Sequence, residues 1–180
     1  MNETLRSFFY ERVERAMERR KAPLSDETQA YTVNFLAAYA RRTGLAGRRS
    51  RALALDFMEA IDRGASALRD VGDRALYIAG VVPRSLDRGP VDVRYVASIG
   101  TNAYREVGGI LPTLTVFHEL AESFDTVRLI VGDATTSEDH EHINLLEVYE
   151  RWLQVRDQRD AEVLLAAGMR LDDATPHGVH

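Results

Sequence analysis

Residues Leu68–Tyr104, LRDVGDRALYIAGVVPRSLDRGPVDVRYVASIGTNAY, decide the fold of this chain. They include its longest apolar run, Ala75–Val82, which is apolar on nearly every side of a helix, so that other elements must cover it. A second apolar pattern with the helical i, i+3, i+4, i+7 spacing follows. Its members are Val93, Val96, Ala97, Gly100, Ala103 and Tyr104. We therefore predict two central helices, joined by the turn-rich segment Pro83–Pro90.

Strands are the alternative for both central segments, because short apolar runs suit either structure. Gly80 and Gly100 favour helices that cross closely. A glycine inside a helix costs roughly 0.5–1 kcal/mol relative to alanine, and close approach of two backbones is a reason to keep it. The residues that alternate as a strand would are Val91, Val93, Tyr95, Ala97 and Ile99.

Amphipathic patterns predict further helices in the rest of the chain. The first, about Glu3–Arg20, has an apolar stripe and places Arg12 on its charged face. The third, about Ser50–Arg63, has Leu53, Phe57, Ala60 and Ile61 on one side. A single helix is expected over about Pro112–Val131. The remaining predicted helices are about Ser25–Arg42, about Glu141–Asp157, and a short one that ends at Gly168.

The composition indicates one folded domain. Hydrophobic residues make up 45% of the 180 residues and charged residues 28%, which is typical of a globular chain. We predict an all-α fold, a single compact bundle of seven to eight helices over residues 1–170, with a disordered tail at 171–180. The absence of cysteine excludes disulfides, thiolate zinc sites and thiol catalysis. We recognise neither a secretory signal nor an apolar run of about 20 residues, and expect a cytoplasmic protein with no membrane partner.

The charge is distributed unevenly along the chain. Residues 1–90 carry 16 basic and 12 acidic side chains (+4), and residues 91–180 carry 7 and 16 (−9), which gives −5 overall. The negative total argues against general affinity for nucleic acid. The asymmetry would suit a protein partner or self-association, although two solvated surfaces would produce the same distribution.

Polar residues on the two central helices form the first candidate site. If the helices cross, arginines and tyrosines from both would meet in a partly buried group. Such a group could line a pocket for an anionic or polar ligand, or it could be structural and fix the register of the helices. The candidate pocket residues are Asp73, Arg74, Tyr77, Arg94, Tyr95 and Tyr104.

A second candidate site is a metal centre. His118 and Glu122 stand four residues apart on one helix face and could bind one divalent metal, with Glu119 beside them. The acidic loop after this helix adds His140 and His142. The HExxH pattern of zinc peptidases is not present, so half-buried, hydrogen-bonded side chains are the alternative. We predict no resident cofactor, with a divalent metal as the possibility that this motif leaves open.

A third candidate is the basic segment Arg41–Arg51, RRTGLAGRRSR. Five arginines around two glycines could bind phosphate or a nucleic-acid backbone. The spacing of a P-loop is absent, and no aromatic side chain stands in the segment to stack on a base. A solvated loop between helices is the alternative, and nucleic acid is the less favoured partner.

The central stretch also carries a resemblance to other proteins. Its first part contains Gly72, Asp73, Ala75, Leu76, Tyr77, Ile78 and Gly80, and its second contains Val93, Tyr95, Gly100, Ala103 and Tyr104. This pattern resembles a group of bacterial all-helical proteins to which no activity is attached. The resemblance implies a helical fold, and it implies nothing about chemistry.

These observations favour a non-catalytic interaction or regulatory module over an enzyme. Amphipathic helices are abundant, and the spacings of the common catalytic motifs are not found. The expected partner is another protein or a second copy, bound by the first helix or by the central arginine–tyrosine surface. The alternatives are a metal-dependent enzyme or ligand-binding helical protein, and an anion or nucleic-acid binder that uses Arg41–Arg51.

Overall fold

The computed structural model describes residues 2–41, 52–83, 92–136 and 143–171. Within these ranges the chain folds into nine α-helices and one π-helical turn, with no strand. The predicted all-α fold is confirmed, and the number of helices is slightly above the predicted seven to eight. The elements are α1 (Asn2–Arg20), α2 (Asp26–Tyr39), α3 (Leu53–Arg63), α4 (Ala65–Leu76), η1 (Tyr77–Val81), α5 (Val93–Ile110), α6 (Thr115–Glu122), α7 (Phe124–Thr135), α8 (Leu145–Val155) and α9 (Gln158–Ala166).

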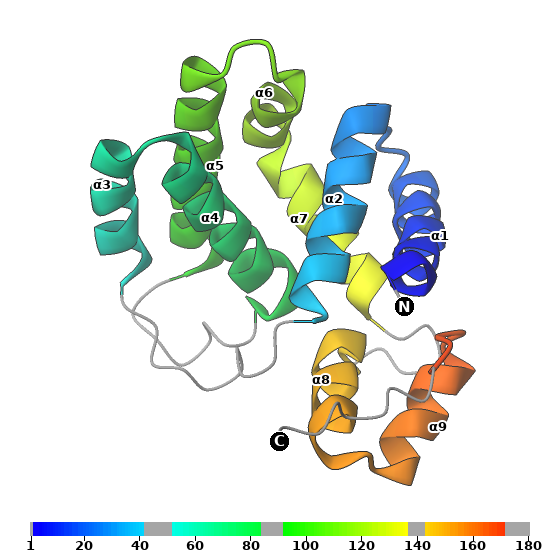
Figure 1. The fold of residues 1–180 in the computed structure, drawn as a ribbon. Coiled ribbons are helices and arrows are strands. Elements are labelled where there is room, and N and C mark those ends of the chain that lie inside the picture. The colour runs from blue at the N-terminus through cyan, green and yellow to red at the C-terminus, as the bar shows by residue number, and fades with distance from the viewer. Residues whose placement is uncertain (1, 42–51, 84–91, 137–142, 172–180) are drawn as a thin grey trace.

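Helices α4 and α5 pack against each other, as the sequence predicts, and lie between α3 and α7 (Figure 1). The strand alternative is therefore wrong for the described part of both segments. The close crossing occurs at Gly100, where an added Cβ would lie 2.8 Å from the Cβ of Ala75 and 2.4 Å from the ring of Phe124. Gly80 does not take part in this crossing. Its Cβ position lies 2.8 Å from the carbonyl oxygen of Arg128, so Gly80 makes room for α7 instead.

We expect Gly100→Ala to lower the free energy of unfolding by about 1–3 kcal/mol, because the added methyl group has no space in this crossing. Gly109→Ala, on the same helix, should raise it by up to about 1 kcal/mol, since nothing lies within 4 Å of its Cβ position and alanine favours a helix. Urea unfolding of both variants tests the pair. If both variants changed the free energy of unfolding by the same amount in the same direction, α4 and α5 would not pack as closely as described.

The first helix is part of the core rather than an available surface. Its apolar stripe includes Leu5, Phe9 and Val13, which are at most 4% exposed. The helix packs against α2 and α7 (Figure 1). The apolar stripe of this helix is thus already covered inside the molecule.

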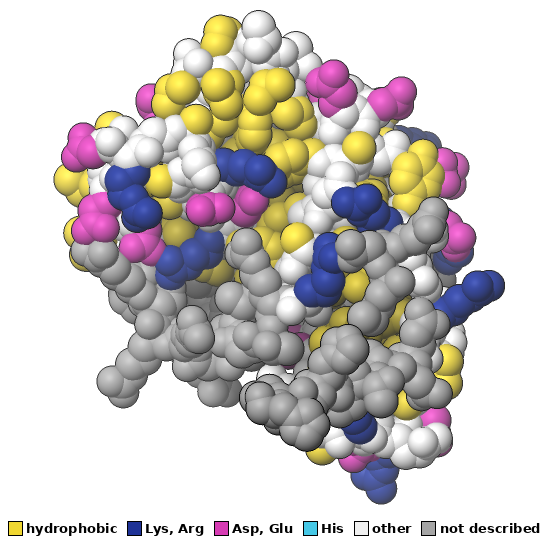
Figure 2. Space-filling view, in the orientation of Figure 1, with side chains coloured by type: hydrophobic (Ala, Val, Ile, Leu, Met, Phe, Trp, Pro, Cys, Tyr) yellow, Lys and Arg dark blue, Asp and Glu magenta, His cyan; other side chains and the backbone are white. Residues whose placement is uncertain are grey.

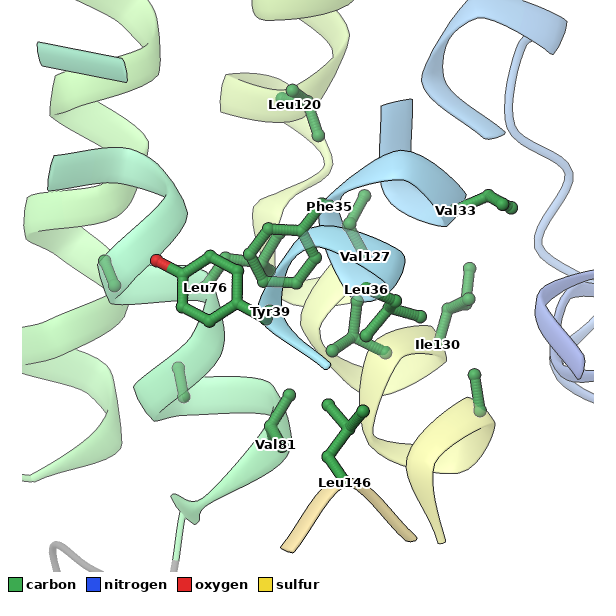
Figure 3. Close-up of a cluster of buried hydrophobic side chains, with 14 of the residues drawn as sticks. Val33, Phe35, Leu36, Tyr39, Leu76, Val81, Leu120, Val127, Ile130 and Leu146 are labelled. Carbon is green, nitrogen blue, oxygen red and sulfur yellow. The ribbon is translucent and has the colours of Figure 1, made fainter. Parts of the chain in front are cut away.

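One cluster of buried apolar side chains joins helices α2, α4, α7 and α8 (Figure 3). Leu36 of α2 is fully buried in it, as are Val127 and Ile130 of α7. Leu76 at the end of α4 is also fully buried, and Leu146 of α8 is 4% exposed. Residues from four separate helices therefore share one core.

The helix predicted over about Pro112–Val131 is divided at Ser123 into α6 and α7. The break allows Phe124, which is 3% exposed, to lie against α5. Its ring centroid is 6.0 Å from that of Tyr104. This contact joins residues far apart in the sequence, and a local apolar pattern does not encode it.

Helices α8 and α9 form a pair below the main bundle (Figure 1). Asn144 caps α8 by accepting from the backbone N–H of Leu146 at 3.0 Å, and it donates its side-chain amide to the carbonyl of Val81 at 2.7 Å. Asp157 caps α9, and Arg151 of α8 donates to Asp160 of α9 at 2.7 Å.

In the described ranges, no helix combines the length and the hydropathy that crossing a bilayer requires.

Candidate functional site

A partly buried carboxylate, Asp73, lies where α2, α4 and α5 meet. Its Oδ1 accepts from the hydroxyl of Tyr31 at 2.5 Å and from the hydroxyl of Tyr104 at 2.8 Å. Arg69, one turn earlier on α4, lies with Nε 3.7 Å from Oδ2 and donates to the Tyr31 hydroxyl at 3.1 Å. Gly72 provides the room, because a Cβ there would be 2.6 Å from the Tyr104 ring. We call Tyr31, Arg69, Asp73 and Tyr104 the Asp73 cluster.

Burial governs the electrostatics of this cluster. It raises the pKa of Asp73, and the hydrogen bonds from Tyr31 and Tyr104 and the charge of Arg69 oppose part of that rise. Burial and the neighbouring carboxylate also raise the pKa of both tyrosines, so their hydroxyls stay protonated and act as donors. The two protonated hydroxyls therefore connect α2 and α5 to the carboxylate of α4.

Asp73 should make the stability of the protein depend on pH. The folded protein binds this proton more tightly than the unfolded chain, whose aspartate has the ordinary pKa of 3.8. Folding thus takes up a proton between pH 3.8 and the raised pKa, and the contribution of Asp73 to stability falls as the pH rises through this window. Urea unfolding at several pH values, with Asp73→Asn as reference, measures it. The free energy of unfolding of the unmodified protein minus that of Asp73→Asn should fall as the pH rises. If this difference stayed constant or increased with pH, the raised pKa of Asp73 would be contradicted.

The structure brings together only two of the six predicted pocket residues, Asp73 and Tyr104. Arg74 turns away and forms an ion pair with Asp56 of α3. Tyr77 stacks on Tyr39, with ring centroids 4.8 Å apart. The other two, Arg94 and Tyr95, are exposed on the first turn of α5.

Two members of the cluster, Tyr31 and Arg69, were not among the predicted residues. A sequence signal exists for Arg69, because it precedes Asp73 by four residues on one helix face. Tyr31 comes from α2, and its position in the sequence does not indicate the contact.

The predicted metal-binding residues that the structure describes are engaged separately. His118 is exposed, and its ring covers Gly108 of α5, with Cε1 2.9 Å from the Cβ position. Glu119 accepts from Thr28 at 2.6 Å and from the backbone N–H of Ser25 at 3.0 Å, at the start of α2. Burial opposes its ionisation, but hydrogen bonds from Ser25 and Thr28 outweigh this and lower its pKa.

Glu122 lies elsewhere again, on the rim of an open cleft of about 330 Å³ at the junction of α6 and α7. His140 and His142 lie outside the described residues. Across the described ranges, no group of three or more histidine, cysteine, aspartate or glutamate side chains is arranged to hold a metal ion. The cleft is lined by Thr101, Arg105, Ala121, Glu122, Ser123, Phe124, Asp125 and Thr126.

The basic segment falls mostly outside the described residues, which resume at Ala52. Its first member, Arg41, donates to the carbonyl of Ala37 at 2.9 Å at the end of α2. The structure thus assigns a contact to this one arginine of the five.

Helix α3 shows large apolar side chains to solvent. Leu55, Met58 and Ile61 are 50%, 65% and 52% exposed, and they follow one another at intervals of three residues. We call these three residues the α3 ridge. The sequence places Ile61 on one apolar side with Leu53, Phe57 and Ala60, and the structure separates it from Leu53 and Ala60, because Ile61 faces solvent. Leu53 and Ala60, on the other side of the helix, are 8% and 2% exposed.

The ridge is presented by an anchored helix. Helix α3 packs on α4 and α5. The ion pair between Asp56 and Arg74 ties it to α4 in addition.

Comparison of the chain with protein-family models, with curated proteins and with solved structures finds no match.

Proposed function

We propose that this chain is a non-catalytic helical interaction module that binds a protein partner on the α3 ridge. The observation that carries the proposal is the exposure of three large apolar side chains on one helix. Complete burial of such a side chain is worth about 1.5–3 kcal/mol, so a partner that covers the exposed half of each gains a few kcal/mol from the ridge. Contiguous exposed apolar surface on a folded domain commonly marks an interaction site.

The rigidity of α3 supports the proposal. The buried side of the helix and the Asp56–Arg74 ion pair hold it in place before any partner arrives. Binding to a preorganised surface avoids the entropic cost of ordering it. Truncation of a central apolar side chain should then reduce affinity without a change in the fold.

Site-specific photo-crosslinking tests the proposal. A photoreactive amino acid at position 58 should crosslink to a specific protein in cells, and the same amino acid at Leu165 of α9, which is 56% exposed, should not. The crosslinked protein is then purified, and its affinity is measured for the unmodified chain and for Met58→Lys. We expect a loss of at least about tenfold, which corresponds to 1.4 kcal/mol.

Two results would contradict the proposal. One is equal crosslinking from positions 58 and 165. The other is a purified partner that binds Met58→Lys as tightly as the unmodified chain. Because Met58 is 65% exposed, its substitution should change the free energy of unfolding by no more than about 0.5 kcal/mol, and urea unfolding checks this.

A further inference from the structure

The α3 ridge has the dimensions of a helix-binding surface. An α-helix rises about 1.5 Å per residue, so the eleven residues of α3 span about 16 Å. Side chains at intervals of three form one of the two kinds of ridge that fit between the side chains of a second helix. Leu55, Met58 and Ile61 follow this spacing.

The two sides of the ridge differ in charge. At 100° per residue, Glu59 and Asp62 lie on the same side of Met58, and both are exposed. Ala54 lies on the opposite side. Arg63, also exposed, lies on the same side as Glu59, one turn further along the helix and further from Met58. In Figure 2, hydrophobic, acidic and basic side chains lie next to one another at the edge where Figure 1 places α3. The charged side chains nearest the ridge on this side are therefore two carboxylates, Glu59 and Asp62, and we call them the acidic edge.

A second copy of the chain fits this surface poorly. Two α3 helices related by a two-fold axis at Met58 would place Glu59 and Asp62 of both copies along the same edge. Four carboxylates would then line that one edge, and like charges at an interface are unfavourable. A stable dimer also buries roughly 800 Å² on each partner, contributed by about 20–30 residues. The ridge offers three large apolar side chains.

We infer that the α3 ridge binds an amphipathic helix of another protein, with lysine or arginine along one edge of its apolar stripe. The apolar stripe packs on Leu55, Met58 and Ile61, and the basic edge lies against Glu59 and Asp62. This inference rests on the proposed function, and it adds the chemical class of the partner. Burial at the ridge supplies affinity, and the acidic edge selects the basic partner.

Two designed helical peptides test the inference by fluorescence anisotropy. They share one leucine stripe and differ only along one edge, which carries lysine in the first peptide and glutamate in the second. The lysine-edged peptide should bind the protein at least about tenfold more tightly at low salt, and added salt should reduce the difference. Asp62→Lys should remove the preference, and Glu59→Lys with Asp62→Lys should reverse it. Met58→Lys should weaken both peptides, and Leu165→Lys should leave both unchanged.

The outcomes separate the inference from the proposed function. If both peptides bind equally, or if Asp62→Lys does not change their ratio, the partner is not selected by charge and the inference is wrong. The docking function still stands in that case if Met58→Lys weakens binding. If neither peptide binds, or if binding does not depend on Met58, the ridge does not take a helix. A dimer that sedimentation detects and that Met58→Lys dissociates would make a second copy the occupant and overturn the inference.

Discussion

Replacement of Leu36 by alanine should lower the free energy of unfolding by about 2–5 kcal/mol. Leu36 is fully buried in the cluster that joins α2 to α7, α4 and α8 (Figure 3). Its truncation removes apolar area from the core and leaves a cavity that the surrounding helices fill only in part. Urea unfolding measures the effect, as a shift of the midpoint at an unchanged slope.

Leu55→Ala is the matched control, because it removes the same atoms from a side chain that is 50% exposed. It should change the free energy of unfolding by no more than about 0.5 kcal/mol. The same variant should weaken binding at the α3 ridge. Leu36 would then contribute to stability, and Leu55 to binding. Similar losses of stability for the two variants would contradict the assignment of Leu55 to the surface.

Arg12→Met should lower the free energy of unfolding by about 2–4 kcal/mol. Arg12 is 7% exposed, and its Nε donates to the carbonyl of Ala134 at 2.7 Å. A second donor of the guanidinium reaches the carbonyl of Thr136. Both acceptors lie at the end of α7, where a cation also compensates the helix dipole. Methionine preserves much of the packing of the stem and removes the charged donors.

Arg15→Met provides the control on the same helix. The side chain of Arg15 is 54% exposed and forms an ion pair with Glu11 at 3.5 Å. Exposed pairs of this kind contribute about 0–1 kcal/mol, so the change should be small. If Arg12→Met were as mild as Arg15→Met, the contact between α1 and the end of α7 would not stabilise the fold.

The all-α fold and its central pair were predictable because their signals are local. The run Ala75–Val82 has to be covered on most sides, and the end of α4 meets α5 while η1 packs on α7. Gly100 marked the close crossing correctly. Gly80 carried the same signal, yet its neighbour is α7, because a glycine shows that some element comes close without showing which one.

The contacts that hold the fold together were less predictable. Arg12 belongs to the charged face of a clean amphipathic helix, and its burial depends on carbonyl groups 122 and 124 residues away. The break at Ser123 likewise follows from the packing of Phe124 against α5. Periodicity along one segment carries no information about either partner.

The candidate sites show the same limit. The pattern of polar residues found Asp73 and Tyr104 and missed Tyr31, which reaches Asp73 from another helix. Glu119 was expected beside a metal, whereas it accepts hydrogen bonds at the start of α2. The α3 ridge was missed for a different reason. Its helix has apolar residues on two sides, and the sequence does not show which side faces the core.

Hydrogen–deuterium exchange of the protein, alone and with the lysine-edged peptide, tests the docking claim most directly. If the ridge binds the peptide, protection should increase in α3, at residues 53–63, and Met58→Lys should abolish the increase. Helix α1, whose apolar stripe is already buried, should show no change. Protection that appears on another helix while α3 exchanges as before would contradict the assignment of the α3 ridge as the docking surface.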